Sequence, residues 1–259
     1  MRNKKINTLL NILLPIITIL VIFLIWFLAS WIVGDDIILA TPIDTIKHGF
    51  LLFGDSHFWK SLGGTLIRSI VAFVLSFVLA FVFAFISRIN KRCKTVVKIL
   101  ISILRALPTI AIILLLLLWT TSKIAAIVVT MIVVLPTIYS SIMLAFDNLD
   151  PEIIEMCNIY KVSKKQQFFK YTLPQTTPSI IDTIGGGLSL NIKLIVASEV
   201  IAGTAISIGQ MMNESKIYFE TANLFALVLI TIIVSVTIEF VFGVIANIYR
   251  GRHGFRKHK

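Results

Sequence analysis

Ionisable side chains occur within otherwise apolar stretches of this sequence. Arg68, Arg105, Lys193 and Glu199 each lie in a largely aliphatic run. A charge inside a bilayer is costly, so such residues usually face a water-filled cavity or pair with another group. Their chemistry would be the binding of a charged solute or the joining of two helices. Lys193 and Glu199 are six residues apart, about 120° around a helix, so we expect no direct pair between them.

Each of the four charges has a structural alternative. Arg68 lies near the end of its run, where snorkelling to the headgroup layer is the simplest interpretation. Arg105 is explained equally well by snorkelling or by a contact at a gate. Lys193 lies near mid-span, so it either lines a translocation path, where it offers a point charge to an anionic solute, or pairs with another helix or a dimer partner. Glu199 fits a gate or a helix contact. The candidate path residues are Arg105, Asn191, Lys193, Ser198 and Glu199.

No signature of catalysis accompanies these charges. The sequence contains no G-x-x-x-x-G-K-[ST], H-E-x-x-H, C-x-x-C or G-x-S-x-G, the patterns that cradle phosphates, bind zinc or present a nucleophile. A membrane-embedded enzyme would need clustered Asp, His or Glu at one membrane face, and none is present. We therefore assign no catalytic residue, no metal and no cofactor, and any ATP hydrolysis must come from a separate protein.

The elements that position these residues are membrane helices. Of the 259 residues, 57% are hydrophobic and 14% are charged, whereas soluble domains carry about a quarter charged residues. A bilayer core needs roughly 20 apolar residues of helix. The sequence predicts an all-α, polytopic, single-domain membrane protein, 1–259, with six spans at about 9–33, 62–86, 96–119, 124–144, 180–203 and 223–248. The first apolar run, about 25 residues, exceeds the 7–15 of a signal peptide core, so we interpret it as a retained helix.

The distribution of basic residues predicts the orientation. With the N-terminus inside, cytoplasmic segments hold 17 Lys and Arg residues and external segments hold 4, as the positive-inside rule requires. Six spans then place both termini in the cytoplasm of a multi-pass protein of the inner or plasma membrane. The net charge of +11 is explained by this topology and by contact with anionic lipid, and we expect no nucleic-acid partner.

The longest internal connector, 146–179, has helix signals. Asp150-Pro151-Glu152 supplies an N-cap, a first-turn proline and an acidic residue near the helix dipole. The apolar stripe that follows lies at helical spacing: Ile153, Met156, Cys157 and Tyr160. Ser163 with Gln166 predicts a second helix start, which we expect Pro174 to end. An earlier external helix is predicted at 43–52, after Thr41-Pro42.

An amphipathic helix of this kind has two interpretations. Its polarizable apolar stripe could insert into a groove on a partner protein. Alternatively, the stripe could pack on the chain's own membrane helices or lie in the headgroup layer. Composition alone favours neither interpretation.

The connector resembles the "EAA" signature of permease subunits of ATP-binding-cassette importers. The family pattern is Glu-Ala-Ala, three residues, Gly-Ala-Ser and, about nine residues later, Leu-Pro. The matching positions here are Glu155-Met156-Cys157, Lys161-Val162-Ser163 and Leu173-Pro174. This resemblance implies a coupling helix that docks in a cleft of the ATPase subunit. The ATPase-coupling residues are then Glu155, Met156, Cys157, Tyr160, Lys161 and Ser163.

Lys161 departs from the family pattern, in which glycine occupies this helix end. We expect left-handed backbone geometry there, which costs a lysine on the order of 1 kcal/mol. Met156 and Cys157, larger than the family's alanines, imply a differently shaped groove on the ATPase.

Further pieces of the sequence are similar to the same family, nearest its nitrate/sulfonate/taurine branch, which includes permeases for thiamine-precursor pyrimidines. These pieces are Leu104-Arg105-Ala106-Leu107-Pro108, Thr41-Pro42, Leu66-Ile67-Arg68, Pro136, Ala197-Ser198-Glu199 and Ile208-Gly209. The resemblance implies a type I (MetI-like) permease fold. It also implies four kinds of partner: a second permease copy in a homodimer or a similar subunit in its place, an ATPase subunit dimer, an extracytoplasmic solute-binding protein or lipoprotein, and membrane lipid.

The main alternative function is an ion-coupled secondary transporter. Such a transporter predicts internal repeats and broken mid-membrane helices. The sequence contains no visible repeat and no paired acidic residues at mid-span, so we prefer the importer subunit.

Overall fold

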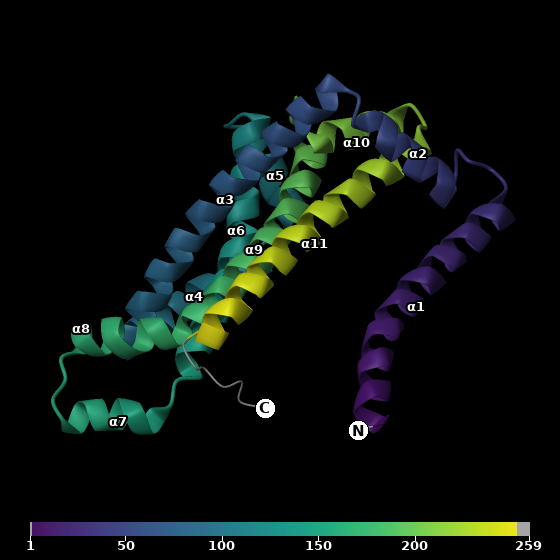
Figure 1. The fold of residues 1–259 in the computed structure, drawn as a ribbon. Helices are drawn as coiled ribbons and strands as arrows, with labels where there is room; N and C mark the ends of the chain where they lie inside the picture. The colour runs from purple at the N-terminus through teal and green to yellow at the C-terminus, as the bar shows by residue number, and fades with distance from the viewer. Residues whose placement is uncertain (1, 253–259) are drawn as a thin grey trace. The chain divides into compact units, whose positions relative to one another are not determined.

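The computed structural model of the protein describes residues 2–252, with side chains described for 13–251, and its regular elements in that range are all helices (Figure 1). Five helices are long and apolar enough to cross a membrane, and one bent pair makes a sixth candidate span. The predicted all-α, polytopic class is confirmed. The described residues form two compact units, 2–59 with 211–230 and 60–210 with 231–252.

The smaller unit contains α1 (Arg2–Val33), α2 (Pro42–Leu52), the end of α10 (Ile208–Ile217) and the first part of α11 (Thr221–Arg252). The indole of Trp26 stacks on Phe225 with ring centroids 5.4 Å apart, and its Nε1 donates to the carbonyl of Ala40 at 3.1 Å. The Thr41 hydroxyl caps α2 by accepting from the Asp44 amide. The predicted external helix is thus present, with its predicted cap.

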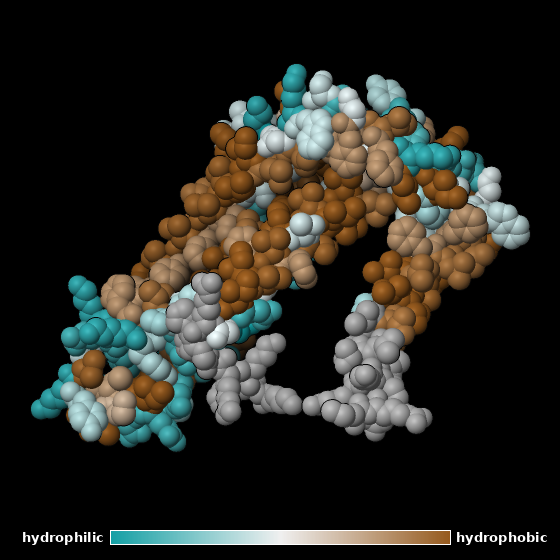
Figure 2. Space-filling view, viewed as in Figure 1, coloured by the Kyte–Doolittle hydropathy of each residue, from teal (hydrophilic) through white to brown (hydrophobic). Residues whose placement is uncertain are grey.

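The larger unit is built around α6 (Ser122–Asp147) and α9 (Leu173–Ala202), which pack together along their lengths. α3 (Ser56–Ile89) and α4 (Lys91–Ala106) complete its main apolar core, to which Phe73, Val97 and Ile138 contribute. In Figure 2, hydrophobic side chains cover the middle of the long helices, and hydrophilic side chains gather over α7 (Pro151–Ile159) and α8 (Lys164–Gln167). This distribution is that of helices in lipid with a polar connector beyond their ends.

The third predicted span, 96–119, is not one helix. It consists of α4 and α5 (Thr109–Leu117), bent by 84° at the break between them. Leu107 and Pro108 are both extended there, with ψ of 126° and 113°. Proline has no N–H and disfavours helical geometry in the residue before it, so the helix ends before Leu107. By contrast, Pro136 lies inside α6, which runs on through it.

The predicted end of the second connector helix at Pro174 is wrong. From α8 the chain continues through a π-helical segment, Phe168–Thr172, directly into α9. Pro174 lies in the first turn of α9, where the N–H that proline lacks matters least. The helix that carries the fifth predicted span, α9, therefore starts at Leu173, before the predicted 180, within a continuous helical run Lys164–Ala202. It ends at Gly203, whose left-handed φ of 62° closes the helix, as glycine does at many helix ends.

Candidate functional site

Helix α7 begins with the predicted cap. A carboxylate oxygen of Asp150 accepts a hydrogen bond from the Glu152 amide at 2.9 Å, and Pro151 occupies the first turn. The carboxylate thereby satisfies an amide that has no partner within the helix. Pro151 has no N–H, so it adds no further unpaired donor to the first turn. A nine-residue helix is marginal by itself, so this cap is a substantial part of what keeps α7 helical.

The other end of α7 is a Schellman motif. The Val162 amide donates to the Cys157 carbonyl at 2.9 Å, and the Lys161 amide donates to the Asn158 carbonyl at 3.1 Å. This pair of bonds requires left-handed geometry at the residue whose amide donates the shorter-range bond. That residue is Lys161, and its φ is 51°. The left-handed geometry expected at the family's glycine position is therefore present, with a lysine in it.

The apolar stripe of α7 is partly uncovered. No residue of α7 is buried. Met156 is 50% exposed and Tyr160 is 77% exposed, whereas Ile153 and Cys157 are half-buried. Glu155 is exposed beside the stripe. Of the alternatives, packing of the whole stripe on the chain's own helices does not occur in this subunit.

One aromatic residue of the connector packs against two of the long helices. Ser163 caps α8 by accepting from the Gln166 amide at 3.2 Å, as predicted. Directly after α8, the ring of Phe168 packs edge-on against two other rings. Its centroid lies 4.9 Å from that of Phe85 on α3 and 6.4 Å from that of Phe146 on α6. A displacement of the connector therefore acts directly on two long helices.

Arg68 and Glu199, near the other end of α3 and α9, form a buried ion pair. The Arg68 Nε donates to Glu199 Oε1 at 2.7 Å, and the Glu199 side chain is fully buried. The second carboxylate oxygen accepts from the Thr65 hydroxyl at 2.9 Å and from the Gly209 amide at 3.4 Å. Arg68 also donates to the Ile206 carbonyl at 3.1 Å. Snorkelling, expected for Arg68 from the sequence, is wrong because its guanidinium has these acceptors inside the protein.

Two glycines let the chain close around this pair. A Cβ on Gly209 would lie 2.4 Å from the Cβ of Glu199 and 2.7 Å from the backbone nitrogen of Val200. A Cβ on Gly64 would lie 2.9 Å from the Ile206 carbonyl oxygen. The sequence pieces around Arg68, Glu199 and Gly209, which are far apart in the chain, thus meet at one place. Arg68 and Glu199 carry opposite charges near the same end of two predicted spans, and this similar depth is the sequence signal that could have predicted their pairing.

Asn191 and Ser198 are also buried in the subunit. The Asn191 amide donates to the carbonyl and to the hydroxyl of Ser69, both at 2.7 Å. The Ser198 hydroxyl lies 3.5 Å from that of Thr130 on α6. Both side chains join α9 to neighbouring helices. With Glu199, they are the three candidate path residues that the structure places inside the subunit.

Lys193 and Arg105 are the candidate path residues with exposed side chains. Lys193 lies on an exposed face of α9 with Gly186 and Ala197. Arg105, in the last turn of α4, donates to the Pro136 carbonyl at 3.2 Å and to the Ser140 hydroxyl. The exposed face of α9 that carries Lys193 thus combines one charge and two small residues with one aliphatic residue, Ile201.

Sequence reasoning missed an ion pair between Asp182 of α9 and Arg250 of α11. Asp182 is close to the predicted start of a span at 180 and Arg250 follows the predicted end of another at 248, so charges at matching span ends were the available signal. Among the described residues, no group of three or more His, Cys, Asp or Glu could hold a metal ion.

Comparison with known structures shows the fold. A chain of the MetNI methionine ABC transporter, in an inward-facing crystal form, matches with a TM-score of 0.60 at 18% identity, covering 74% of this chain and 93% of that one. A chain of an amino acid ABC transporter crystallised with histidines matches with a TM-score of 0.61 at 16% identity, covering 81% and 97%. At these identities the likeness concerns the fold alone.

Sequence comparison shows the family. No curated protein matches the chain. The model of the family described as "Binding-protein-dependent transport system inner membrane component" matches residues 76–252. This match covers more than half of the chain, including α7, α9 and the described part of the sequence up to its end. The chain therefore belongs to the family of inner-membrane components of binding-protein-dependent transport systems, the permease subunits of ABC importers.

Proposed function

We propose that this permease subunit forms the translocation path of its importer as a homodimer, with both termini in the cytoplasm and α7 as the helix that docks in an ATPase subunit. An extracytoplasmic binding protein or lipoprotein delivers the solute, and two ATPase subunits supply the energy. The solute is a small nitrate-, sulfonate- or taurine-like compound or a thiamine-precursor pyrimidine. The chain itself hydrolyses no ATP.

The uncovered face of α7 is the observation that carries this proposal. Glu155, Met156 and Tyr160 are presented to the surroundings on a helix whose two ends are both capped. A capped helix loses little conformational entropy on binding, and an exposed methionine adapts to an irregular groove. An acidic residue beside apolar anchors is a suitable insert for a cleft on a partner.

The contacts of Phe168 suggest how docking becomes motion. When ATP draws the two ATPase subunits together, the α7 helices held in them move toward each other. Because Phe168 packs against both Phe85 and Phe146, that movement is passed to α3 and α6. The spans then change from an inward-open to an outward-open arrangement, and hydrolysis reverses the change.

Replacing Glu155 with arginine tests the docking helix. We expect Glu155→Arg to abolish binding-protein-dependent uptake and to release the ATPase during purification, because it reverses the charge on the inserted face. Amounts of the variant in the membrane should equal those of the wild type. The measurements are uptake in cells that carry all subunits, ATPase co-purification and membrane yield.

The matched control is Asp36→Arg, which also reverses an exposed acidic residue but lies in the connector before α2. It should leave uptake and co-purification at wild-type levels. Wild-type co-purification and uptake in Glu155→Arg would disprove the docking role of α7.

Lys193 supports the proposed path and dimer. An ammonium group near mid-span is too costly to face lipid, and its helix face carries Gly186 and Ala197, which allow another helix to approach closely. In a homodimer the two copies of this face would border a central path. An anionic solute would then meet two positive charges.

Substitutions of Lys193 test the path and the solute class together. Lys193→Gln should lower uptake of the anions nitrate or an alkanesulfonate at least tenfold, whereas Lys193→Arg, which keeps the charge, should retain most of it. Uptake of an uncharged thiamine-precursor pyrimidine should change little in both. Lys216→Gln, at an exposed position on α10, is the control. Equal uptake by Lys193→Gln and wild type for every solute would overturn the path assignment.

A further inference from the structure

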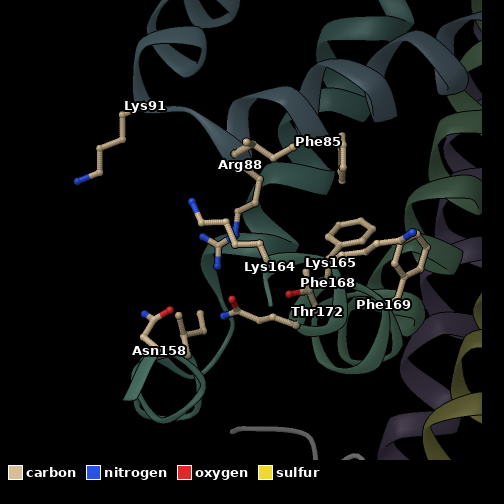
Figure 3. Close-up of a pocket in the computed structure, with 12 residues that line it drawn as sticks. Phe85, Arg88, Lys91, Asn158, Lys164, Lys165, Phe168, Phe169 and Thr172 are labelled. Atoms are coloured by element: carbon tan, nitrogen blue, oxygen red, sulfur yellow. The ribbon is translucent and has the colours of Figure 1, made fainter. Parts of the chain in front are cut away.

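A hollow lies between the end of α3 and the connector helices. It has a volume of about 610 Å³, and its wall combines residues of α3, the start of α4, α7, α8 and the π-helical segment. Four cationic side chains line it: Arg88, Lys91, Lys164 and Lys165. Figure 3 shows Arg88 and Lys164 reaching into the middle of the view from opposite walls, with Lys91 at its margin. No carboxylate lines the hollow.

The four cations have no anionic partner in the subunit. Among the residues that the structure describes, none of them takes part in an ion pair, whereas nearby Lys94 pairs with Asp147 at 3.4 Å. All four side chains are exposed, so solvent screens part of their mutual repulsion, and an anion between them would relieve the rest. Phosphate is the group that clustered Arg and Lys side chains recognise most readily.

Most of the remaining wall residues are apolar, and the uncharged polar ones are Asn158, Gln167 and Thr172. Phe85 is half-buried on α3, and Phe169 is 57% exposed on the π-helical segment. A free phosphate would satisfy the cations and leave this surface uncovered. A ligand with both an anionic group and a hydrocarbon part would cover both halves of the wall.

The position of the hollow along α3 indicates the source of such a ligand. Arg88 lies in the last turn of the 34-residue helix α3, where its apolar span ends. Phe85 is one turn deeper into the span, about 4.5 Å along the helix axis. Lys and Arg residues gather just beyond the ends of apolar spans, at the level of the headgroups, so phospholipid headgroups lie at the depth of this hollow.

We propose that the hollow is a binding site for an anionic phospholipid, with its phosphate held by Arg88 and Lys164 and an acyl chain against Phe85 and Phe169. The site is separate from the proposed ATPase-docking face, because α7 contributes only Ile154 and Asn158 to the hollow. A lipid bound in the hollow would contact both α3 and the connector. The membrane's content of anionic lipid would thereby stabilise the position of the connector.

Lipid titration of the purified full chain in detergent tests this site. Native mass spectrometry would count lipids bound from three separate additions: phosphatidylglycerol, phosphatidylcholine and inorganic phosphate. For the wild type we expect one tightly held phosphatidylglycerol, with at least tenfold weaker binding of phosphatidylcholine. We expect the double variant Arg88→Gln/Lys164→Gln to weaken phosphatidylglycerol binding at least tenfold, since each basic residue near a membrane surface contributes about 1 kcal/mol.

The control is Arg92→Gln/Lys170→Gln, which removes two exposed cations from α4 and the π-helical segment that do not line the hollow. It should bind phosphatidylglycerol within about twofold of wild type. Phe169→Ser should weaken lipid binding without changing the weak binding of phosphate. Thermal unfolding of each variant checks that all are folded.

Three results would overturn the proposal. Equal lipid binding by the lining variant and the control would show that the hollow is not the site. Phosphate competing as well as phosphatidylglycerol would show a soluble anion site instead. Loss of ATPase co-purification in Arg88→Gln/Lys164→Gln, with lipid binding unchanged, would show that the hollow receives the ATPase. The Glu155→Arg result is independent of all three.

Discussion

The two parts of the molecule that carry its unusual residues, the α7 helix and the Arg68–Glu199 pair, contrast in how they are held. α7 has no buried residue, and hydrogen bonds between near neighbours define both of its ends. Glu199 has no exposed surface, and the hydrogen-bond donors to its carboxylate come from Thr65, Arg68 and Gly209. One feature depends on local sequence and the other on the packing of distant segments.

This contrast has an energetic side. Local caps contribute about 1 kcal/mol each, whereas removing one partner of a buried ion pair costs about 3–5 kcal/mol. The α7 region is therefore shaped to present a surface, and the buried pair is shaped to hold α3, α9 and α10 together. Substitutions in the two regions should consequently differ both in size and in what they damage.

The largest effect should come from breaking the buried pair. Arg68→Ala or Glu199→Ala should lower the free energy of unfolding by about 3–5 kcal/mol, because the remaining partner stays buried without its counter-charge. SDS titration of the purified protein would measure it. Lys94→Ala, at the exposed pair with Asp147, should cost less than about 1 kcal/mol. Comparable losses for Arg68→Ala and Lys94→Ala would contradict the distinction between the two regions.

A smaller effect should follow from crowding the same site. Gly209→Ala places a Cβ against backbone atoms of α9 that cannot move away, and overpacking of this kind costs about 1–3 kcal/mol. Gly243→Ala is the matched control, since a Cβ there meets nothing within 4 Å. That substitution should stabilise α11 by about 0.5–1 kcal/mol. The same SDS titration should therefore give shifts of opposite sign.

In α7 the expected change is modest and favourable. Lys161→Gly removes the cost of a left-handed lysine, about 1 kcal/mol, and should slow hydrogen exchange of the Val162 amide about fivefold. Global stability should stay nearly constant. Lys164→Gly, at the first position of α8, should give no slowing at Val162. Faster exchange in Lys161→Gly would show that the left-handed geometry at 161 is not present in solution.

The smallest effect concerns another local cap, at α2. The Thr41 hydroxyl, 2.6 Å from the Asp44 carboxylate, and the Lys47 ammonium together hold the pKa of Asp44 below its ordinary value. A lowered pKa in the folded state adds stability above the unfolded-state pKa, and this is lost as pH falls through the lowered value. Thr41→Val should raise the pKa of Asp44, and Lys47→Gln should raise it less. Carboxyl-carbon NMR titration would measure both, and an unchanged pKa in Thr41→Val would contradict the hydrogen bond.

The contrast also explains what could be predicted from the sequence. The caps at Thr41, Asp150 and Ser163 follow from residue type and short spacing, whereas the left-handed position 161 was expected from the resemblance to the family's glycine position. The structure contains all four. The apolar spans could also be predicted, because contact with lipid requires an apolar sequence along each helix separately.

What was missed depends on three-dimensional context. Arg68 lies near a span end, where sequence favours snorkelling, and only the approach of Glu199 and the Ile206 carbonyl makes burial favourable. Pro174 ends helices in most contexts, but here it follows a π-helical segment and opens α9. The predicted span 96–119 runs through Pro108, whereas the structure has a bend of 84° between two helices there.

That break has a consequence for where water can go. α5 has nine residues, about 13 Å of helix, less than half of the roughly 30 Å hydrocarbon core. The last carbonyls of α4 lack donors from a following turn, and hydrocarbon supplies none, so such backbone persists only where protein or water reaches it. The break in the apolar stretch 96–119 should therefore lie against protein or beside a water-filled cavity, and should not face lipid.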